Sequence, residues 1–341
     1  MKKVVLGLSG GVDSAVSAAL LKKEYEVFGL YLDIGLPGGA DEARAAADAL
    51  GVPLHVRDIR AQLEEKVCAP FADAYRRGET PNPCVACNPA VKFRALCELA
   101  DELGAEHVAT GHYVRAEGGA LYRGRPANDQ SYMLCRVRRE QAARFVTPLG
   151  ALEKTETRRI AEELGLAVAK KPDSMEICFI PDRNYVGWLE SRGLTPRPGP
   201  VRFHGETVME HSGIHRWTVG QRLPGLFDGR KLYVARIDGP ENAVEAALWE
   251  ELFRTRLYAR DMNWLIDEPQ SPLRARVRVR HTKWEMPECT VHPDGDGGAW
   301  IECDEPVRAP APGQAAALYD GDRLIGGGTI TEKTQGIEKN T

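Results

Sequence analysis

The stretch Leu8-Ser9-Gly10-Gly11-Val12-Asp13-Ser14 stands between a run of apolar β-formers and an alanine-rich helical pattern. Its two glycines let the backbone turn tightly and approach a ligand closely. Its serines add hydroxyl donors, and the N-terminus of the next helix offers unpaired N–H groups and partial positive charge. At the carboxyl end of a strand, this arrangement predicts an anion-binding loop. It is neither a Walker loop nor Gly-x-Gly-x-x-Gly, because the required lysine and glycine spacing are missing.

Strands and helices alternate on either side of this loop. Strands are predicted over residues 4–8, 27–32, 54–59 and 107–110, and helices over residues 15–23, 41–50, 62–77 and 91–103. Gly51 and Gly104 follow two of these helices, as glycine often does at a helix end. Such alternation predicts a parallel sheet covered on both faces. Right-handed crossovers make it a doubly wound α/β domain.

The pattern changes near residue 183. Residues 195–200 read Thr-Pro-Arg-Pro-Gly-Pro, which we expect to form neither a helix nor a central strand. Short β-like runs follow at 201–203, 232–237, 275–279 and 314–319, and residues 263–272 suggest a second linker. We therefore expect an α/β domain over residues 1–183, a small central domain over 184–265 and a C-terminal β-barrel-like domain over 266–341.

The composition excludes several classes of protein. With 43% hydrophobic and 28% charged residues in 341, the chain is neither disordered, collagen-like nor a coiled coil. No uncharged run approaches the roughly 18 residues of a membrane helix, and the N-terminus lacks a secretion-signal pattern, so we expect a cytoplasmic protein without membrane contact. Because the net charge is −4, a polyanionic partner would need a local basic face. The eight cysteines are then expected to be free, catalytic or metal-binding.

Two stretches place cysteines in a reactive setting. Residues 80–88, Thr-Pro-Asn-Pro-Cys-Val-Ala-Cys-Asn, contain two prolines that predict a rigid extended loop. Cys87 would then begin the next helix, where the helix dipole, Lys92 and Arg94 would lower its thiol pKa, as a nucleophile requires. Cys178 lies much later, in an apolar run. The other five are expected to be buried small hydrophobes: Cys68, Cys97, Cys135, Cys289 and Cys303.

Arginines alternate with apolar residues near the C-terminus, at Arg274, Arg276, Arg278 and Arg280. On a strand this spacing places four guanidinium groups on one face, and such a face suits a phosphate backbone. A solvated strand surface balanced by neighbouring acids explains the pattern equally well. His281 and Lys283 would extend the basic end.

Taken together, these stretches resemble the tRNA-specific 2-thiouridylase family of the PP-loop ATP pyrophosphatase superfamily. The resemblance rests on SGGVDS (9–14), TPNPCVACN (80–88), VKF (91–93), ATGHY (109–113), DQSY (129–132), ICF (177–179) and TVGQR (218–222), and covers nearly the whole chain. It implies a doubly wound, parallel-sheet PP-loop ATPase domain followed by two small β-rich domains. It also implies an ATP-dependent transferase that replaces the C2 oxygen of a wobble uridine by sulfur, in tRNA of the Lys, Glu and Gln type.

The resemblance further implies roles for individual residues. ATP would adenylate the C2 oxygen, with Asp13 helping to hold Mg²⁺. Cys178 would carry a persulfide received from a donor protein, such as a cysteine desulfurase or a persulfide relay protein. Cys87 would attack its inner sulfur and leave a Cys87–Cys178 disulfide. The implied ATP-binding residues are Gly7, Leu8, Ser9, Gly10, Gly11, Val12, Asp13, Ser14, Leu32 and Gly111, although Leu32 suits a core position equally well. The implied tRNA-binding residues are Asn82, Pro83, Cys84, His112, Asp129, Gln130, Ser131, Arg280, His281 and Gln314.

One residue departs from the family pattern and leaves alternatives open. Many relatives have Asp, a candidate general base, where this chain has Cys84. With Cys87 and Cys178 it offers three thiolates, which suggests a [4Fe–4S] cluster with one open iron, or zinc with a fourth ligand, instead of a persulfide relay. Cys84 as a spare thiol is the simpler explanation. Two other functions also stay open: another PP-loop adenylating synthetase, or a non-catalytic RNA-binding or metal-storage protein.

Overall fold

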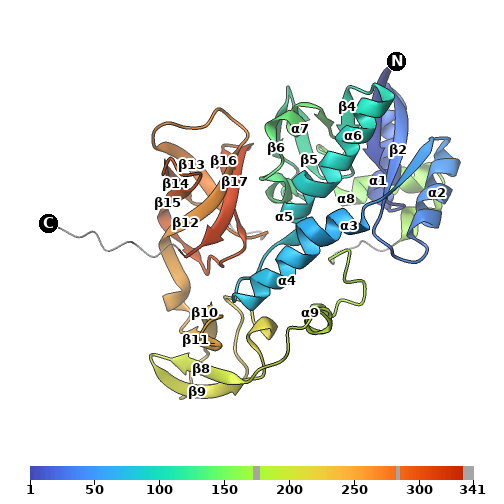
Figure 1. Ribbon diagram of the computed structural model, residues 1–341. Helices are drawn as coiled ribbons and strands as arrows, with labels where there is room; N and C mark the ends of the chain where they lie inside the picture. The colour runs from blue at the N-terminus through green and yellow to red at the C-terminus, as the bar shows by residue number, and fades with distance from the viewer. Residues whose placement is uncertain (172–176, 282–284, 333–341) are drawn as a thin grey trace.

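The computed structural model describes residues 1–171, 177–281 and 285–332, arranged as an α/β domain, a β-barrel and a smaller β-rich part (Figure 1). Residues 174–176 of the second cysteine motif, and Lys283, lie outside the described residues. None of the described helices is long and apolar enough to cross a membrane.

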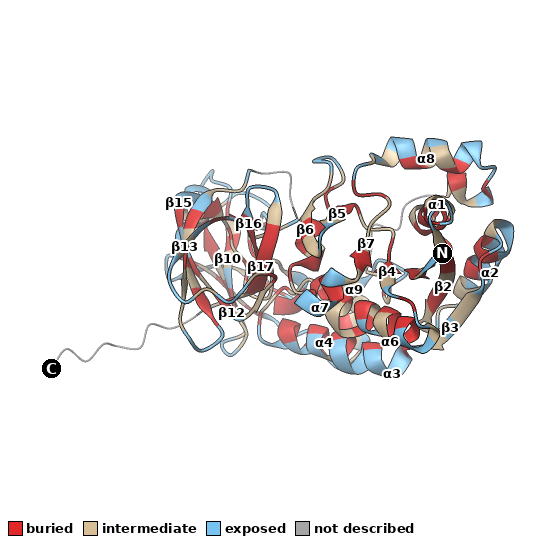
Figure 2. Cartoon of the chain, turned by 90° about the horizontal axis from the view of Figure 1, so that it is seen from above, coloured by how far each residue is buried: buried red, intermediate tan, exposed pale blue. Residues whose placement is uncertain are grey.

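A five-stranded parallel sheet forms the centre of the first domain. Its order is β3 (Leu54–Asp58), β2 (Tyr25–Asp33), β1 (Lys2–Gly7), β4 (His107–Ala109) and β7 (Phe145–Val146). Val4 and Leu6 pack with the helix α1 (Val12–Leu21), whereas Val5 packs with α6 (Phe93–Leu103) on the opposite face. Figure 2 shows α1 and α8 (Lys154–Glu163) on one side of the sheet and α6 on the other. The predicted doubly wound fold is therefore confirmed.

The strand order fixes where a ligand site can form. The chain moves outward from β1 through β2 to β3, and then crosses to β4 on the other side of β1. The carboxyl ends of β1 and β4 thus flank the topological switch point, where open α/β sheets bind ligands. Gly51 and Gly104 end α2 (Gly39–Leu50) and α6 in the left-handed conformation, as predicted.

The helix before the first cysteine motif agrees closely with its predicted range of 62–77, whereas the next helix begins earlier than the predicted residue 91 and contains the motif. A continuous run comprises α3 (Arg60–Leu63), a π-helical turn (Glu64–Cys68) and α4 (Ala69–Arg76). A second run comprises α5 (Pro83–Cys87), a π-helical turn (Asn88–Lys92) and α6. The expectation of an extended loop through Pro83 is wrong, because Asn82 caps the helix by accepting from the Cys84 N–H, and a proline at the first helical position needs no N–H partner.

The central part after α9 (Tyr185–Ser191) is a four-stranded sheet with the order β10 (Tyr233–Asp238), β11 (Ala243–Ala247), β8 (Gly199–Phe203) and β9 (Glu206–His211). Contrary to the expectation for residues 195–200, Pro200 belongs to an inner strand. Its pairing with β9 begins at Gly199, but the pairing with β11 begins only at Val201. Pro200 therefore lies just before the part of β8 that has a neighbouring strand on both sides, a position in which a sheet tolerates proline.

Six strands close into the barrel. Their order is β12 (Phe253–Trp264), β15 (Ala299–Arg308), β14 (Glu288–Pro293), β13 (Leu273–Arg278), β16 (Ala315–Asp320) and β17 (Arg323–Thr331), and β17 returns to β12. The expected linker at 263–272 is wrong, since β12 extends to Trp264 and the following residues connect two barrel strands. The expected domain boundary after residue 265 correspondingly falls inside the barrel, whose first strand begins at Phe253.

A hairpin of the first domain extends the barrel sheet. Strands β5 (Val114–Glu117) and β6 (Ala120–Arg123) follow β4, and β6 pairs with β17 through Leu121 and Tyr122. The remaining helical segments are α7 (Arg139–Ala143) and short 3₁₀ turns at Ser131–Leu134, Ala167–Lys170, Ile214–Arg216 and Glu250–Leu252. The hairpin makes the barrel and the α/β domain share one sheet, so the barrel is held against the switch-point side of the first domain.

Candidate active site

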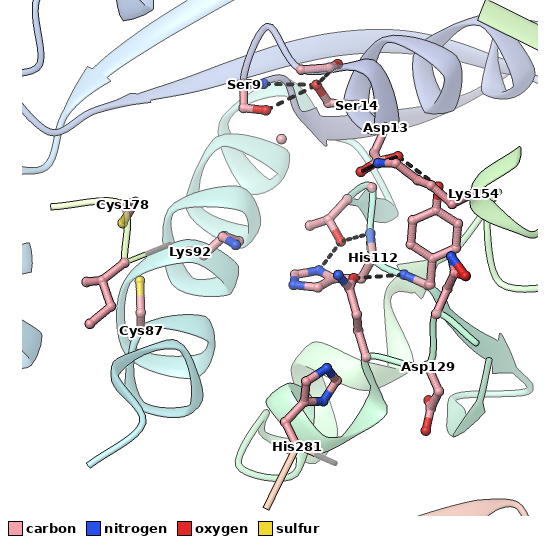
Figure 3. Close-up of a pocket in the computed structure, with 18 of the residues that line it drawn as sticks. Ser9, Asp13, Ser14, Cys87, Lys92, His112, Asp129, Lys154, Cys178 and His281 are labelled. Carbon is pink, nitrogen blue, oxygen red and sulfur yellow. Dashed lines mark hydrogen bonds and ion pairs between the residues drawn. The ribbon is translucent and has the colours of Figure 1, made fainter. Parts of the chain in front are cut away.

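A cavity of about 2040 Å³ opens at the switch point and reaches the barrel. Its wall includes the loop after β1, the residues after β4, the two motif cysteines Cys87 and Cys178, and barrel residues such as Arg276 and His281. Figure 3 shows the loop serines, the two cysteines, His112 and His281 around this cavity. The structure therefore brings together residues from distant parts of the sequence at one site.

The loop after β1 has the geometry of an anion site. Gly10 has φ +75°, and a Cβ there would lie 2.9 Å from backbone atoms of the neighbouring helix α2, so only glycine fits. The Ser9 N–H donates to Ser14 Oγ (3.2 Å), which itself donates to the Gly11 carbonyl (3.0 Å). Gly11 caps α1 without a side-chain hydrogen bond, which leaves N–H groups of the first helical turn available to a ligand.

The proposed ATP-binding residues gather at this end of the cavity. A Cβ on Gly111 would lie 2.9 Å from Asp13 Cβ, so the chain after β4 packs directly on the start of α1. Gly10 supports the loop from outside the cavity, because it packs against α2. The residues that line the cavity are Gly7, Leu8, Ser9, Gly11, Val12, Asp13, Ser14, Leu32 and Gly111.

Asp13 has a cationic partner that the sequence analysis missed. Both of its carboxylate oxygens lie 2.7 Å from Lys154 Nζ, and the Tyr113 hydroxyl donates to it at 2.8 Å. Lys154 belongs to no recognisable motif and is 141 residues away, so only the fold reveals the pair. Asp13 could help to hold Mg²⁺ on a nucleotide, as expected, only after it exchanges this lysine for the ion.

Cys87 and Cys178 lie on the wall opposite, and Lys92 stands between them and His112 (Figure 3). All eight cysteines are free thiols. Burial raises the pKa of the Cys87 thiol to about 11, although Lys92 opposes that shift. Burial likewise raises the pKa of Cys178, a thiol that remains accessible from the cavity. The four cysteines at positions 68, 135, 289 and 303 are buried, as predicted, while Cys97 is partly exposed.

The expected lowering of the Cys87 pKa is therefore wrong, for two structural reasons. The helix begins at Pro83, so its N-terminal dipole acts at Cys84 and Cys87 lies within the helical run. Arg94 is exposed and pairs with Glu98 at 2.8 Å instead of facing the thiol. Lys92 alone of the two expected cations acts on the cysteines.

Cys84 differs from the other two cysteines of the proposed cluster in its position relative to the cavity, although it is near enough to help raise the pKa of both thiols. It is exposed and does not line the cavity, and its neighbours Asn82 and Pro83 border a separate small groove. Within the part of the chain that the structure describes, no group of three or more His, Cys, Asp or Glu side chains is arranged to hold a metal ion. In this conformation the three cysteines fit neither an iron–sulfur cluster nor zinc.

His112 is a neutral member of the cavity wall. Its Nδ1 forms a 2.6 Å hydrogen bond with the Thr110 hydroxyl. Burial, and secondarily the positive charge of Lys92, hold the pKa of His112 well below its usual value. Gln130, also on the wall, accepts from the Tyr113 N–H and thereby fixes the strand that follows His112. His281 lines the barrel end, with its ring 6.2 Å from that of Tyr132.

Four proposed tRNA-binding residues make contacts that join parts of the molecule, and one of them, Asp129, also lines the cavity. Asp129 is buried and accepts from Arg278 of the barrel at 2.8 Å, and Ser131 meets the Tyr319 hydroxyl at 3.0 Å. Gln314 donates to the Thr80 carbonyl at 2.5 Å. Arg280 donates to the backbone carbonyls at 219 and 309. These contacts give the four side chains a role in joining domains.

The alternating arginines at 274–280 are paired with neighbouring groups of the protein. Arg274 pairs with Asp304 and Arg276 with Glu288, both at 2.6 Å, while Arg278 and Arg280 are engaged as described above. Each guanidinium already has an acidic or carbonyl partner, which favours the balanced surface of the two alternatives that the sequence left open.

The fold and the site together define the class of protein: a PP-loop nucleotide-binding domain with two cavity-facing thiols, followed by a four-stranded β-rich module and a β-barrel. The family described as tRNA methyl transferase HUP domain matches residues 2–182, a PRC-barrel domain of the same series matches 191–247, and an aminomethyltransferase beta-barrel domain matches 254–330. The last match begins one residue after the start of β12.

Relatives that match nearly the whole chain identify the family within this class of protein. The tRNA-specific 2-thiouridylase MnmA of Syntrophotalea carbinolica is 41% identical over 96% of this chain and 98% of its own length. The MnmA of Pelotomaculum thermopropionicum is 41% identical over 96% of this chain and 97% of its own length. The MnmA of Gluconobacter oxydans is 42% identical over 96% of this chain and 99% of its own length. The chain belongs to the tRNA-specific 2-thiouridylase family.

Proposed function

We propose that the protein is an ATP-dependent tRNA 2-thiouridine synthase. The observation that carries the proposal is that an anion-binding loop and two free thiols, Cys87 and Cys178, line one cavity. Activation by ATP and delivery of sulfur could then occur on the same base. Family membership supports this choice over another adenylating synthetase.

The loop serves the first half of the reaction. The C2 oxygen of uracil, a poor leaving group, attacks the α-phosphorus of ATP. An oxygen–phosphorus bond forms, the bond to the β-phosphate bridging oxygen breaks, and pyrophosphate departs toward the N–H groups of Ser9–Ser14. Mg²⁺ on the phosphates would neutralise their charge, with Asp13 as its candidate protein ligand.

The thiols serve the second half. The terminal sulfur of a Cys178 persulfide attacks C2, and AMP leaves with the former C2 oxygen. The Cys87 thiolate then attacks the Cys178 sulfur; the sulfur–sulfur bond breaks, its electron pair stays on the new 2-thiouridine, and a Cys87–Cys178 disulfide forms. A dithiol reductant supplies the two electrons that restore both thiols. Lys92, beside both cysteines, favours their thiolate forms.

The partners are those that the family resemblance implies. The substrate is a tRNA of the Lys, Glu or Gln type, whose wobble uridine leaves its stack to enter the cavity. Sulfur arrives from a cysteine desulfurase or a persulfide relay protein, and the reaction takes place in the cytoplasm. A persulfide relay is favoured over a cluster because Cys84 stands outside the cavity.

Serine variants test the proposal. With ATP, Mg²⁺, a persulfide donor and unmodified tRNA, Cys87→Ser and Cys178→Ser should each abolish thiolation, read as retarded migration on a mercury-containing gel. Pyrophosphate release on tRNA should persist in both. Cys97→Ser, which alters a partly exposed thiol outside the cavity wall, is the matched control and should thiolate normally. Full transfer by either cavity variant contradicts the two-thiol mechanism, and loss of transfer in Cys84→Ser as well as in both cavity variants would favour a cluster held by all three cysteines.

A further inference from the structure

The anion-binding loop lacks a positive charge of its own. Residues 7–14 contain no lysine or arginine, whereas a Walker loop supplies a lysine to the phosphates. Backbone N–H groups and a helix dipole provide only partial charge. A departing pyrophosphate, with several full negative charges, therefore needs a cation from another part of the fold.

The fold delivers one lysine directly to this loop. Helix α8 packs on α1, with Ala161 against Val12 and Val16 in one apolar cluster. Glu153 and Glu156 form a capping box at the start of α8, which fixes the backbone on both sides of Lys154, the first helical residue. Lys154 consequently lies beside the N-terminus of α1 and lines the cavity (Figure 3).

The lysine is held there by an acid that belongs to the loop itself. Lys154 Nζ lies 2.7 Å from both oxygens of Asp13, and 5.7 Å from the centre of the Tyr113 ring. The side chains of Lys154 and Asp13 are only 20% and 30% exposed. An anion that enters the loop meets both groups, and it attracts the ammonium while it repels the carboxylate.

We propose that Lys154 is a pyrophosphate-binding residue that Asp13 holds in place until the nucleotide enters. The inference rests on the proposed function, since it names the cation that receives the leaving group. On binding, the ammonium exchanges the Asp13 carboxylate for a phosphate oxygen, and Asp13 becomes available to a cation. No covalent bond changes in this exchange.

Titration with inorganic pyrophosphate, in EDTA and followed by calorimetry, tests this residue alone. Lys154→Gln should weaken binding at least about tenfold, the loss expected for a charge-assisted hydrogen bond, and Lys154→Arg should retain most of it. Asp13→Asn should bind more tightly than the unaltered protein, because it releases Lys154. Arg159→Gln, which removes an exposed cation that pairs with Glu163 on α8, should change nothing.

A double variant separates direct binding from simple neutralisation of Asp13, and it leaves no unpaired half-buried carboxylate that could impair folding. If Lys154 contacts pyrophosphate, Asp13→Asn/Lys154→Gln binds at least about tenfold more weakly than Asp13→Asn. Equal affinity of those two variants would overturn the proposal. Because the titration needs neither tRNA nor sulfur, failure of thiolation in the unaltered protein would leave this result standing.

Discussion

Cys87 illustrates how burial and one nearby charge compete at a single thiol. Burial raises its pKa to about 11, and Lys92 provides the main opposing effect. Only the thiolate is nucleophilic. In this conformation the thiol form of Cys87 therefore predominates at neutral pH.

Alkylation kinetics should report this balance. The rate at which iodoacetamide labels Cys87 should rise about tenfold per pH unit from pH 7 toward 10, since the thiolate fraction does so below the pKa. Lys92→Met should shift the curve to higher pH, and Lys92→Arg should leave it nearly in place. Peptide mass spectrometry distinguishes Cys87 from the exposed Cys84.

Arg94→Gln is the control, because Arg94 is exposed and already paired with Glu98. Its curve should coincide with that of the unaltered protein. Identical curves for Lys92→Met and the unaltered protein would show that Lys92 does not act on the thiol.

At the scale of elements, the helix that presents Cys87 depends on its N-cap. Asn82 accepts from the Cys84 N–H at 3.1 Å, and Pro83 occupies the first helical position. Asn82→Ala should lower the free energy of unfolding by about 1 kcal/mol, whereas Asn82→Asp should preserve most of it. Urea denaturation measures both. If Ala and Asp behave alike, the cap contributes no stability and the residue is free to serve the substrate.

The α/β domain shows which features the sequence can specify and which it cannot. Alternating strands and helices were sufficient to predict the parallel sheet, and the Gly-rich loop to predict the anion site, because both depend on local pattern. Pro83 was misread, since a proline fits an extended loop and a first helical turn equally well. The cap that decides between them depends on the side-chain conformation of Asn82.

Contacts between residues that are distant in sequence could not be predicted from the local sequence pattern. Lys154 meets Asp13 only because α8 packs on α1. The arginines of β13 were correctly placed on a strand, but their partners come from other strands and from the α/β domain. Glu288 is 12 residues from Arg276, Asp304 is 30 from Arg274 and Asp129 is 149 from Arg278, so the local pattern could not distinguish a balanced face from a basic one.

At the scale of the whole molecule, one buried ion pair joins the α/β domain to the barrel. Arg278 of β13 donates to Asp129, and their side chains are 9% and 2% exposed. The adjoining hairpin β5–β6 pairs with β17, so the barrel can form the far wall of the cavity only while this joint holds. The wall includes Arg276 and His281.

Breaking this pair should therefore affect stability and tRNA affinity together. Arg278→Met leaves the buried Asp129 carboxylate with Arg123, 3.5 Å away, as its remaining cation, and should lower the free energy of unfolding by about 1.5–3 kcal/mol. The additional change Asp129→Asn should recover part of that loss, because it removes the buried charge. Arg276→Gln breaks an exposed pair on the same strand and should lower the free energy of unfolding by no more than about 1 kcal/mol. Chemical denaturation measures these stabilities.

The kinetic consequence is measured under conditions in which every variant stays folded. The KM for tRNA should rise in Arg278→Met, while the KM for ATP should stay the same. An equal rise in both KM values would mean that the joint supports the α/β domain as a whole, and that the barrel does not contribute separately to holding the tRNA.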